Sequence, residues 1–461
     1  AAEATARALA ALDECLGGGR RLSLKGLGVS EVPEFVASQL GALTHLEMLD
    51  LSLNPSLRSL PDELSHLSSS LRTLFALGCG FEVVPEPVGK LCSLGMLSFK
   101  SNKLVNLGED AVPASVHWLI LTDNRLTALP RSIGALSGLR KLMLANNRIV
   151  SLPDDICKCT ALELIRLSDN RLAELPAGLL YLPKLAWVAL AGNPCVAVKG
   201  QRVPPPPEVS SSELEMLEEI GRGAGGTVHR AIWHRSTPDV DEASSLPLQV
   251  AVKIFRASAT VSDGDPTHEV DASGAVSHQN MIRVLGRLAG PELGLVQELL
   301  VDHSNLGEPP TFDTCTRDTY KPGTIFTEAI ALRVVRGIAS ALAQLHRDGY
   351  SHGDMYAHNI MINNADGEPR LGDFGAAFCY KSTSIALEPF EQIEVRAFGC
   401  LVEELAAHLD YGAGSTEVAT VAGTASNLKA TLEQLSRSCM GPIDDRPSFE
   451  HIYSDLQDAK L

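Results

Sequence analysis

The sequence lacks the features that mark membrane and secreted proteins. It has no apolar run of about 18 residues, which is the length that a membrane-spanning helix requires, so we expect no membrane span. The ten cysteines are scattered, and the closest pair, Cys157 and Cys159, is too close together for a zinc knuckle. Free thiols in a reducing compartment are the better interpretation, so we expect a cytoplasmic protein.

Basic residues are scarce in the second half of the chain. Residues 1–200 hold 19 basic and 19 acidic residues, whereas residues 201–461 hold 20 basic and 37 acidic ones, which accounts for the whole net charge of −17. Such a field repels nucleic acid and anionic lipid, so we expect neither as a partner. A basic protein partner and a plain solvated surface both remain compatible with this charge. A GTP-binding P-loop is also missing, because no Gly-x-x-x-x-Gly-Lys-Ser/Thr is present.

A repeat fills the first half. The pattern Leu-x-x-Leu-x-Leu-x-x-Asn ends at Asn147 and recurs, with one Leu replaced by Ile, at Asn170; Leu-Pro follows both times. Alternating apolar residues predict one short strand per repeat, and Pro suits the return because it has no amide that needs a partner. After a degenerate first member at Leu27, the residue at the Asn position is, in order, Asn54, Cys79, Asn102, Asn124, Asn147, Asn170 and Asn193.

These repeats resemble leucine-rich repeats over about residues 20–200. The resemblance implies an α/β solenoid with capped ends, because each turn buries its apolar face only against its neighbours. We assign it residues 1–200, with Ala4–Leu16 as an amphipathic helical cap rather than a signal peptide. The missing initiator Met suggests a processed or trimmed chain. We expect the concave face to bind a protein ligand through variable strand positions, which include Glu47, Asp50, Arg72, His117, Trp118, Arg140, Lys141, Met143, Glu163, Arg166, Lys184 and Trp187.

A proline-rich stretch separates the halves. Pro204–Pro207 favour polyproline II, so residues 201–212 are predicted to form a stiff linker. The periodic leucines end before it and the acidic half begins after it. We therefore start the second domain at residue 213.

The second half resembles protein kinases in the order of its motifs. His352-Gly353-Asp354 precedes Asn359 by the spacing of a catalytic loop, and Asp373-Phe374-Gly375 follows a short apolar segment. The resemblance implies an α+β bilobal kinase domain over residues 213–461. It makes Asp354 the group that orients a substrate hydroxyl and accepts its proton, and it makes Asn359 and Asp373 the Mg²⁺ ligands.

The nucleotide site implied by this resemblance is ATP-binding. A glycine-rich turn would cover the phosphates, Lys253 would hold them, and a glutamate would place Lys253. Because His278-Gln279-Asn280 follows nine residues later, Glu269 is favoured over Glu242 and Glu292 as this partner. Asp265 and Asp271 are nearby acidic alternatives. Gln297 would be the gatekeeper. The expected nucleotide contacts are Gly221, Gly223, Gly226, Val228, Ala251, Lys253, Glu298 and Leu300.

Several positions depart from the kinase pattern. Gly353 replaces the Arg that normally docks a phosphate on the activation segment, which makes this a non-RD loop. Tyr356 stands where serine/threonine kinases usually carry Lys, and His358 where many tyrosine kinases place Arg. Arg446, within an ending similar to tyrosine-kinase-like families, lacks its usual Glu. The candidates to replace that Glu are Glu388 and Glu391. At the start of the long helix that follows, Glu394 stands in place of the usual Asp. The candidate phosphorylation sites are Ser382, Thr383 and Ser384.

Two functions follow from these motifs. The first is a soluble kinase that moves the γ-phosphate of ATP, with Mg²⁺, to Ser or Thr of a protein substrate, and the five core residues Lys253, Glu269, Asp354, Asn359 and Asp373 favour it. The alternative is a pseudokinase scaffold that binds nucleotide without efficient transfer. Gly353, Tyr356 and the short segment after Gly375 favour that alternative.

Overall fold

The computed structural model describes residues 2–196, 205–223, 225–235, 247–256, 264–381, 388–409 and 425–458. Its contacts divide the chain into two compact units. The first unit comprises Ala1–Leu185 and Asn193–Cys195, and the second comprises Ala186–Gly192 and Val196–Leu461. None of the helices in the described ranges has the length and apolar character needed to cross a membrane. All ten cysteines are free thiols, as their scattered positions predict.

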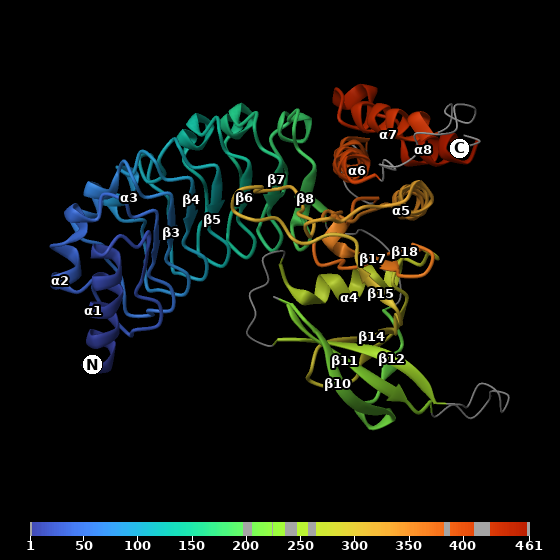
Figure 1. Ribbon diagram of the computed structural model, residues 1–461, viewed down its shortest axis with the longest axis horizontal. Coiled ribbons are helices and arrows are strands. Elements are labelled where there is room, and N and C mark those ends of the chain that lie inside the picture. The colour runs from blue at the N-terminus through green and yellow to red at the C-terminus, as the bar shows by residue number, and fades with distance from the viewer. Residues whose placement is uncertain are drawn as a thin grey trace, which may run out of the picture. The chain divides into compact units, whose positions relative to one another are not determined.

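The first unit is built on short parallel strands, one per repeat (Figure 1). Helix α1 (Ala2–Leu16) covers the expected cap segment and precedes β1. Strand β1 pairs with β2, and each following strand pairs with the next as far as β7. The strands are β1 (Arg21–Ser23), β2 (Met48–Asp50), β3 (Thr73–Phe75), β4 (Met96–Ser98), β5 (Trp118–Ile120), β6 (Lys141–Met143) and β7 (Leu164–Arg166).

Short helical turns form the return segments between these strands. Several begin directly after the Pro of Leu-Pro, where a missing amide needs no partner: Pro61, Pro130 and Pro153 precede η2, η3 and η4. The return segments are α2 (Glu34–Ala37), η1 (Leu40–Ala42), η2 (Asp62–Leu67), α3 (Glu86–Gly89), η3 (Arg131–Ala135), η4 (Asp154–Lys158) and η5 (Leu179–Tyr181), and η6 (Pro194–Val196) follows the last repeat.

The repeated Asn bonds one repeat to the next. Asn124 donates its amide to the carbonyls of Phe99 and Leu121, at 2.9 and 3.0 Å, and accepts a hydrogen bond from the amide of Leu104 at 2.9 Å. At the corresponding position, the Cys79 thiol donates to the carbonyl of Leu51 at 3.3 Å. An amide side chain can donate and accept at once, which explains why Asn suits this buried bend.

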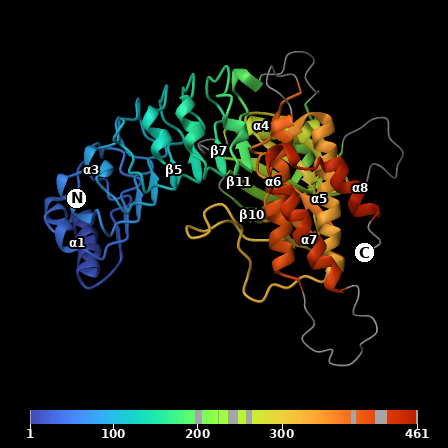
Figure 2. The ribbon, with the colours of Figure 1, turned by 90° about the horizontal axis from the view of Figure 1, so that it is seen from above.

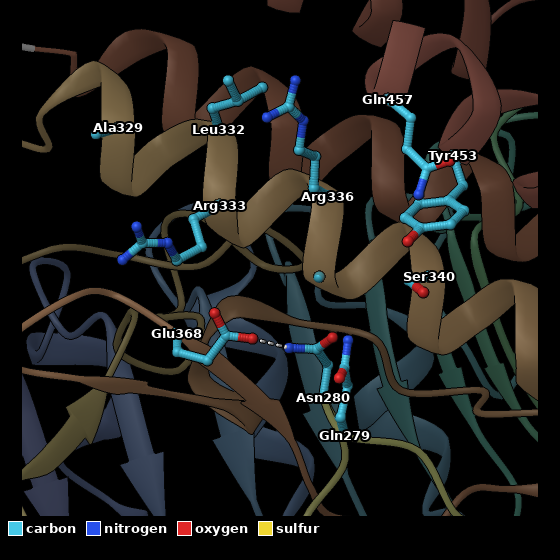
Figure 3. Close-up of a pocket in the computed structure, with 11 residues that line it drawn as sticks. Gln279, Asn280, Ala329, Leu332, Arg333, Arg336, Ser340, Glu368, Tyr453 and Gln457 are labelled. Atoms are coloured by element: carbon cyan, nitrogen blue, oxygen red, sulfur yellow. Dashed lines mark hydrogen bonds between the residues drawn. The ribbon is translucent and has the colours of Figure 1, made fainter.

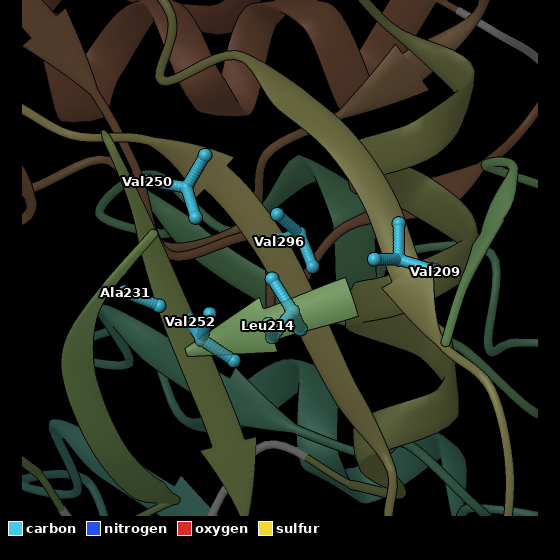
Figure 4. Packing of buried hydrophobic residues seen from close by; sticks show 6 residues of the cluster. All are labelled: Val209, Leu214, Ala231, Val250, Val252 and Val296. Atoms are coloured by element: carbon cyan, nitrogen blue, oxygen red, sulfur yellow. The ribbon is translucent and has the colours of Figure 1, made fainter. Parts of the chain in front are cut away.

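The second unit contains a six-stranded sheet with the order β10-β11-β12-β14-β13-β9. Figure 4 shows its buried core, where Val250, Val252 and Val296 pack with Val209, Leu214 and Ala231. Helix α4 (Pro266–Ala275) packs against this sheet. The strands are β9 (Glu208–Val209), β10 (Leu214–Arg222), β11 (Gly226–Trp233), β12 (Leu248–Phe255), β13 (Val284–Leu288) and β14 (Gly294–Glu298).

The end of the proline-rich stretch joins this sheet. Residues 201–204 of the predicted linker lie outside the described residues. Beyond them, β9 pairs in parallel with β13, and the amide of Arg287 donates to the carbonyl of Pro207 at 2.9 Å. A Cβ on Gly274 of α4 would lie 2.3 Å from the ring of Pro206, so that ring packs directly on the helix. The short turn η7 (Ser211–Glu213) then leads into β10.

Helices dominate the rest of the second unit, and Figure 2 shows α5, α6 and α7 side by side. The 21-residue α5 buries an apolar face and ends at Gly349, whose φ of 80° suits a residue without Cβ. The remaining elements are α5 (Glu328–Asp348), α6 (Glu388–Ala407), α7 (Ala425–Cys439), η10 (Ile443–Asp445), α8 (Phe449–Asp458), η9 (Ala357–Asn359), β8 (Trp187–Ala189), β15 (His303–Asn305), β16 (Tyr350–Ser351), β17 (Ile360–Asn363), β18 (Pro369–Leu371) and β19 (Phe378–Cys379).

Candidate functional site

The glycine-rich stretch forms a turn between two antiparallel strands, β10 and β11. Gly221 pairs with Val228 across the strands, and the amide of Gly223 donates to the carbonyl of Gly226 at 3.0 Å. A Cβ on Gly226 would lie 2.2 Å from the carbonyl oxygen of Ile254, so β11 can approach β12 this closely only with glycine there. The strand–turn–strand context matches the kinase form of this motif and not the dinucleotide form, in which a helix follows.

Lys253 on β12 forms an ion pair with Glu269 on α4. The Lys253 Nζ lies 2.5 Å from Glu269 Oε1, and the two side chains are 18% and 8% exposed. Asp265 instead caps α4 by accepting a hydrogen bond from the amide of Thr267. Asp271 and Glu292 are exposed, and Glu242 lies outside the described residues.

The predicted hinge follows the end of β14. Ala251 is buried on β12 opposite Gln297, and Val250 lies opposite Glu298. The Glu298 carboxylate accepts a hydrogen bond from the amide of Arg283 at 2.9 Å, so its side chain is used within the fold. Leu300 comes two residues later, after the strand has ended.

Hydrogen bonds within the catalytic loop place Asp354 beside Asn359. The Asn359 amide nitrogen donates to the Asp354 carboxylate at 3.0 Å and to its backbone carbonyl at 2.8 Å. His352 is fully buried, its Nε2 lies 3.0 Å from the carbonyl oxygen of Gly372, and its ring packs on Phe374 at 4.8 Å. These contacts join the loop to the Asp373-Phe374-Gly375 segment.

Gly353 has a backbone conformation that explains its identity. Its φ is 72°, which favours glycine, and an added Cβ would lie 2.5 Å from the Val188 carbonyl oxygen and 2.7 Å from that of Ala376. Its amide donates to the buried carboxylate of Glu394 at 2.8 Å, which also accepts from His346 at 2.8 Å. Burial opposes the charged carboxylate, but His346 and this amide outweigh it and hold the pKa of Glu394 below its usual range.

His358 is anchored by Asp318. The Asp318 carboxylate accepts from the His358 amide at 2.9 Å and lies 2.7 Å from Nδ1 of its ring. Burial disfavours the charged imidazole, but the Asp318 carboxylate outweighs it and raises the pKa of His358. The imidazole also lies beside Tyr356, with ring centroids 5.0 Å apart.

Asp373 is exposed and has a φ of 55°, a left-handed conformation that is uncommon outside glycine, asparagine and aspartate. Its carboxylate accepts from the amide of Gly375 at 3.3 Å. Within the described ranges, no three His, Cys, Asp or Glu side chains gather as a cation site would require.

Arg446, the residue predicted to lack its usual glutamate, is held by main-chain carbonyls. It donates to Gly441 at 3.0 Å and to Gln392 at 2.8 Å, and burial lowers its pKa to about 10. Glu391, one candidate substitute, accepts a hydrogen bond from the Tyr380 hydroxyl at 3.1 Å. The side chain of Glu388 is outside the described part of the chain, as are Ser382, Thr383 and Ser384.

A separate pocket of about 730 Å³ lies between α5 and α8 (Figure 3). Arg333, Arg336 and Ser340 of α5 line it, with Glu368 bonded to Asn280 at its floor. Gln279 and Asn280 of the kinase-like motif line this pocket, but none of the predicted catalytic, nucleotide-contacting or metal-ligating residues does. It is distinct from the predicted ATP site.

Sequence reasoning missed two residues of this site. Trp187 was assigned to the concave repeat face, but it is 2% exposed and its ring stacks on Tyr356. Asp318 lies in a segment with no periodic pattern, so no signal in the sequence identified it. The signal for Trp187 was its large aromatic side chain on the last repeat strand, which suggested a contact but not its partner.

Comparisons with known families agree with both halves. Residues 214–392 match the model described as "Protein kinase domain", and residues 114–172 and 137–194 match the leucine-rich repeat model. The chain therefore carries leucine-rich repeats and a protein kinase domain.

Curated relatives resemble parts of the chain. It is 31% identical over 169 residues to the probable serine/threonine-protein kinase PBL20 of Arabidopsis thaliana, covering 36% of this chain and 40% of that protein. It is 29% identical to the probable inactive leucine-rich repeat receptor kinase XIAO of Oryza sativa subsp. japonica, covering 34% of this chain and 13% of that protein. For the calmodulin-binding receptor kinase CaMRLK of Arabidopsis thaliana the identity is 27%, over 43% of this chain and 30% of that protein. The chain thus spans two fifths or less of each of these relatives.

Proposed function

We propose that this protein is a kinase that transfers the γ-phosphate of ATP to Ser or Thr of protein substrates. Its architecture would be a leucine-rich-repeat solenoid over residues 1–200, a linker over 201–212 and a bilobal, tyrosine-kinase-like domain over 213–461. The name of the PBL20 relative supports the Ser/Thr assignment. A cytoplasmic location would fit ten free thiols.

The residues present fit MgATP. Lys253 has an ammonium group that Glu269 holds in place, and the glycine-rich turn has room, since a Cβ on Gly223 would meet nothing within 4 Å. Asn359 uses its amide nitrogen on Asp354, which leaves its amide oxygen for a cation, and Asp373 offers an exposed carboxylate. Oxygen ligands of this kind suit Mg²⁺. When bound, ATP supplies the phosphoryl group and Mg²⁺ neutralises the charge that develops on it.

The mechanism follows from what these side chains can do. Lys253 would hold the α- and β-phosphates, while the turn between β10 and β11 covers them. Asp354 would accept a hydrogen bond from the substrate hydroxyl and take its proton as the hydroxyl oxygen bonds to the γ-phosphorus, while the bond from that phosphorus to the β–γ bridging oxygen breaks and ADP leaves. Asn359 would keep the Asp354 carboxylate turned toward that hydroxyl through the 3.0 Å hydrogen bond.

One observation carries the proposal, and it is the ion pair of Lys253 with Glu269 at 2.5 Å. Both side chains are largely buried, so loss of either partner would leave the other as an unpaired buried charge, which is costly. Together with Asp354 and Asn359 in hydrogen-bond contact, it favours phosphotransfer over a pseudokinase.

The test is transfer of radiolabelled γ-phosphate by the full chain to itself or to a generic protein substrate. We expect transfer with the unaltered chain and none with Asp354→Asn, which should still bind nucleotide. Asp271→Asn, an exposed carboxylate on α4, is the matched control and should leave transfer unchanged. Transfer that persists in Asp354→Asn would refute the role of Asp354. A melting temperature raised by MgATP with no transfer above background would favour the pseudokinase.

We also propose that the repeats bind a protein partner. The face formed by the strand positions carries charge of both signs, with Arg72 exposed and Glu47, Arg140 and Glu163 half-buried. Arg140 and Glu163 form an ion pair at 3.1 Å, so part of this charge is already used within the repeats. Reversal of the charge at Arg72 should weaken capture of the partner. Reversal of the charge at Lys25 is the control and should leave capture unchanged.

A further inference from the structure

The segment Ala186–Gly192 follows the repeat pattern, but it belongs to the second compact unit. Its first strand residue, Trp187 on β8, is 2% exposed. The indole N–H donates to the backbone carbonyl of Met355 at 2.9 Å, directly after Asp354. The indole ring also lies parallel to the Tyr356 ring, with centroids 4.4 Å apart and 4° between the planes.

This contact is one of several that fix the catalytic loop from outside. Glu394 of α6 holds the amide of Gly353, and Asp318 holds His358. The residues that Trp187 contacts, Met355 and Tyr356, lie between these two anchored positions along the chain. Without it, the part of the loop directly beside Asp354 would lose both a hydrogen bond and an aromatic contact.

The backbone of β8 also fills space beside the loop. The carbonyl oxygen of Val188 lies 2.5 Å from where a Cβ on Gly353 would be. The strand therefore occupies the position into which any side chain at 353 would project. An Arg side chain at position 353 and this path of β8 would occupy the same space, so the absence of Arg at 353 and the position of the strand depend on each other.

We propose that Ala186–Gly192 braces the catalytic loop and that Trp187 is a positioning residue for phosphotransfer, acting through Met355 and Tyr356 on Asp354. This inference rests on the proposed kinase function. Most kinases with Arg at the position of Gly353 use it to bind a phosphate on the activation segment. Here the brace does the equivalent work without phosphorylation. The Lys253–Glu269 and Asp354–Asn359 contacts are formed while the brace is in place, which favours support over inhibition.

The first test is hydrogen exchange of the full chain, which needs no activity. The amides of Gly353 and His358 report on the loop, because each is hydrogen-bonded to a carboxylate outside it. We expect Trp187→Ala to speed exchange of residues 352–359 by about tenfold, as a loop freed by roughly 1.4 kcal/mol would show. Trp233→Ala, the same change at a partly buried position packed against the core of the six-stranded sheet, should leave exchange of this loop unchanged.

The second test is kinetic. In Trp187→Ala we expect kcat to fall about tenfold while the KM for ATP stays within about twofold, since the nucleotide contacts lie elsewhere. Trp187→Phe keeps the stacked ring and loses the N–H, so it should recover part of the rate. A loop whose exchange does not change in Trp187→Ala would overturn the brace, and a rise in kcat would show that the segment inhibits. If the unaltered chain transfers no phosphate but Trp187→Ala speeds exchange of the loop, the proposed kinase function is refuted and the brace is not.

Discussion

Alanine at position 353 should destabilise the second unit by more than its small size suggests. The φ of 72° costs a residue with Cβ about 1–2 kcal/mol. The added Cβ would also lie 2.5 Å from the Val188 carbonyl oxygen and 2.7 Å from that of Ala376, and crowding in a packed site costs about 1–3 kcal/mol. Together these terms predict that Gly353→Ala lowers the free energy of unfolding of this unit by about 2–5 kcal/mol.

Gly323→Ala separates the two terms. Gly323 has a similar φ of 84°, but an added Cβ there would meet nothing within 4 Å. This variant should therefore lose only the backbone term, about 1–2 kcal/mol. The difference between the two variants measures the crowding that β8 and Ala376 impose on the loop.

Hydrogen exchange at increasing urea is the suitable assay, because the chain has two compact units and a single melting curve would mix them. Peptides from α5 and α6 report on the second unit alone. Equal losses for Gly353→Ala and Gly323→Ala, within about 0.5 kcal/mol, would refute the close approach of Val188. Gly353→Arg, which restores the residue usual in kinases, should be at least as damaging as alanine and should not create control by phosphorylation.

Three further outcomes are expected. Glu269→Gln should reduce phosphate transfer and the rise in melting temperature caused by MgATP, because Lys253 loses its charged partner, whereas exposed Asp271→Asn should change neither. Folding raises the pKa of His358, so the stabilisation from its ion pair with Asp318 is complete below about pH 6.5, the usual pKa of an unfolded histidine, and is lost as pH rises through the pKa of the folded state. The difference in melting temperature between the unaltered chain and His358→Gln should therefore shrink from about pH 6 to about pH 9. Asn124→Ala leaves buried backbone groups without partners, each worth about 1–3 kcal/mol, so urea unfolding of the first unit should shift to clearly lower concentration.

Motif order predicted much of this structure because local patterns determine local elements. The Leu-x-x-Leu-x-Leu spacing predicted the short strands, and the distance from Glu269 to His278-Gln279-Asn280 favoured that glutamate over Glu242 and Glu292, with Asp265 and Asp271 left as alternatives. In the structure it is Glu269 that lies beside Lys253. Asp265 caps the helix, a role that depends only on the residues just after it.

Contacts between distant segments could not be predicted in this way. Trp187 and Tyr356 are 169 residues apart, and neither has a pattern that names the other. The repeat pattern assigns Trp187 to a face, but a face does not specify what covers it. Asp318 lies in a segment without periodicity, so its bond to His358 follows only from the three-dimensional path of the chain.

The departures from the kinase pattern therefore have a structural explanation that does not require loss of function. A loop that had merely lost its Arg would be left with an unfilled site beside Gly353. Instead the Val188 carbonyl fills that space, and the Gly353 amide is bonded to Glu394. Tyr356 stacks on Trp187 at the position where a Lys is usual. Each of these altered residues therefore has a specific partner within one compact unit, and under the proposed brace the loop would be held by Trp187, Glu394 and Asp318 without a docked phosphate.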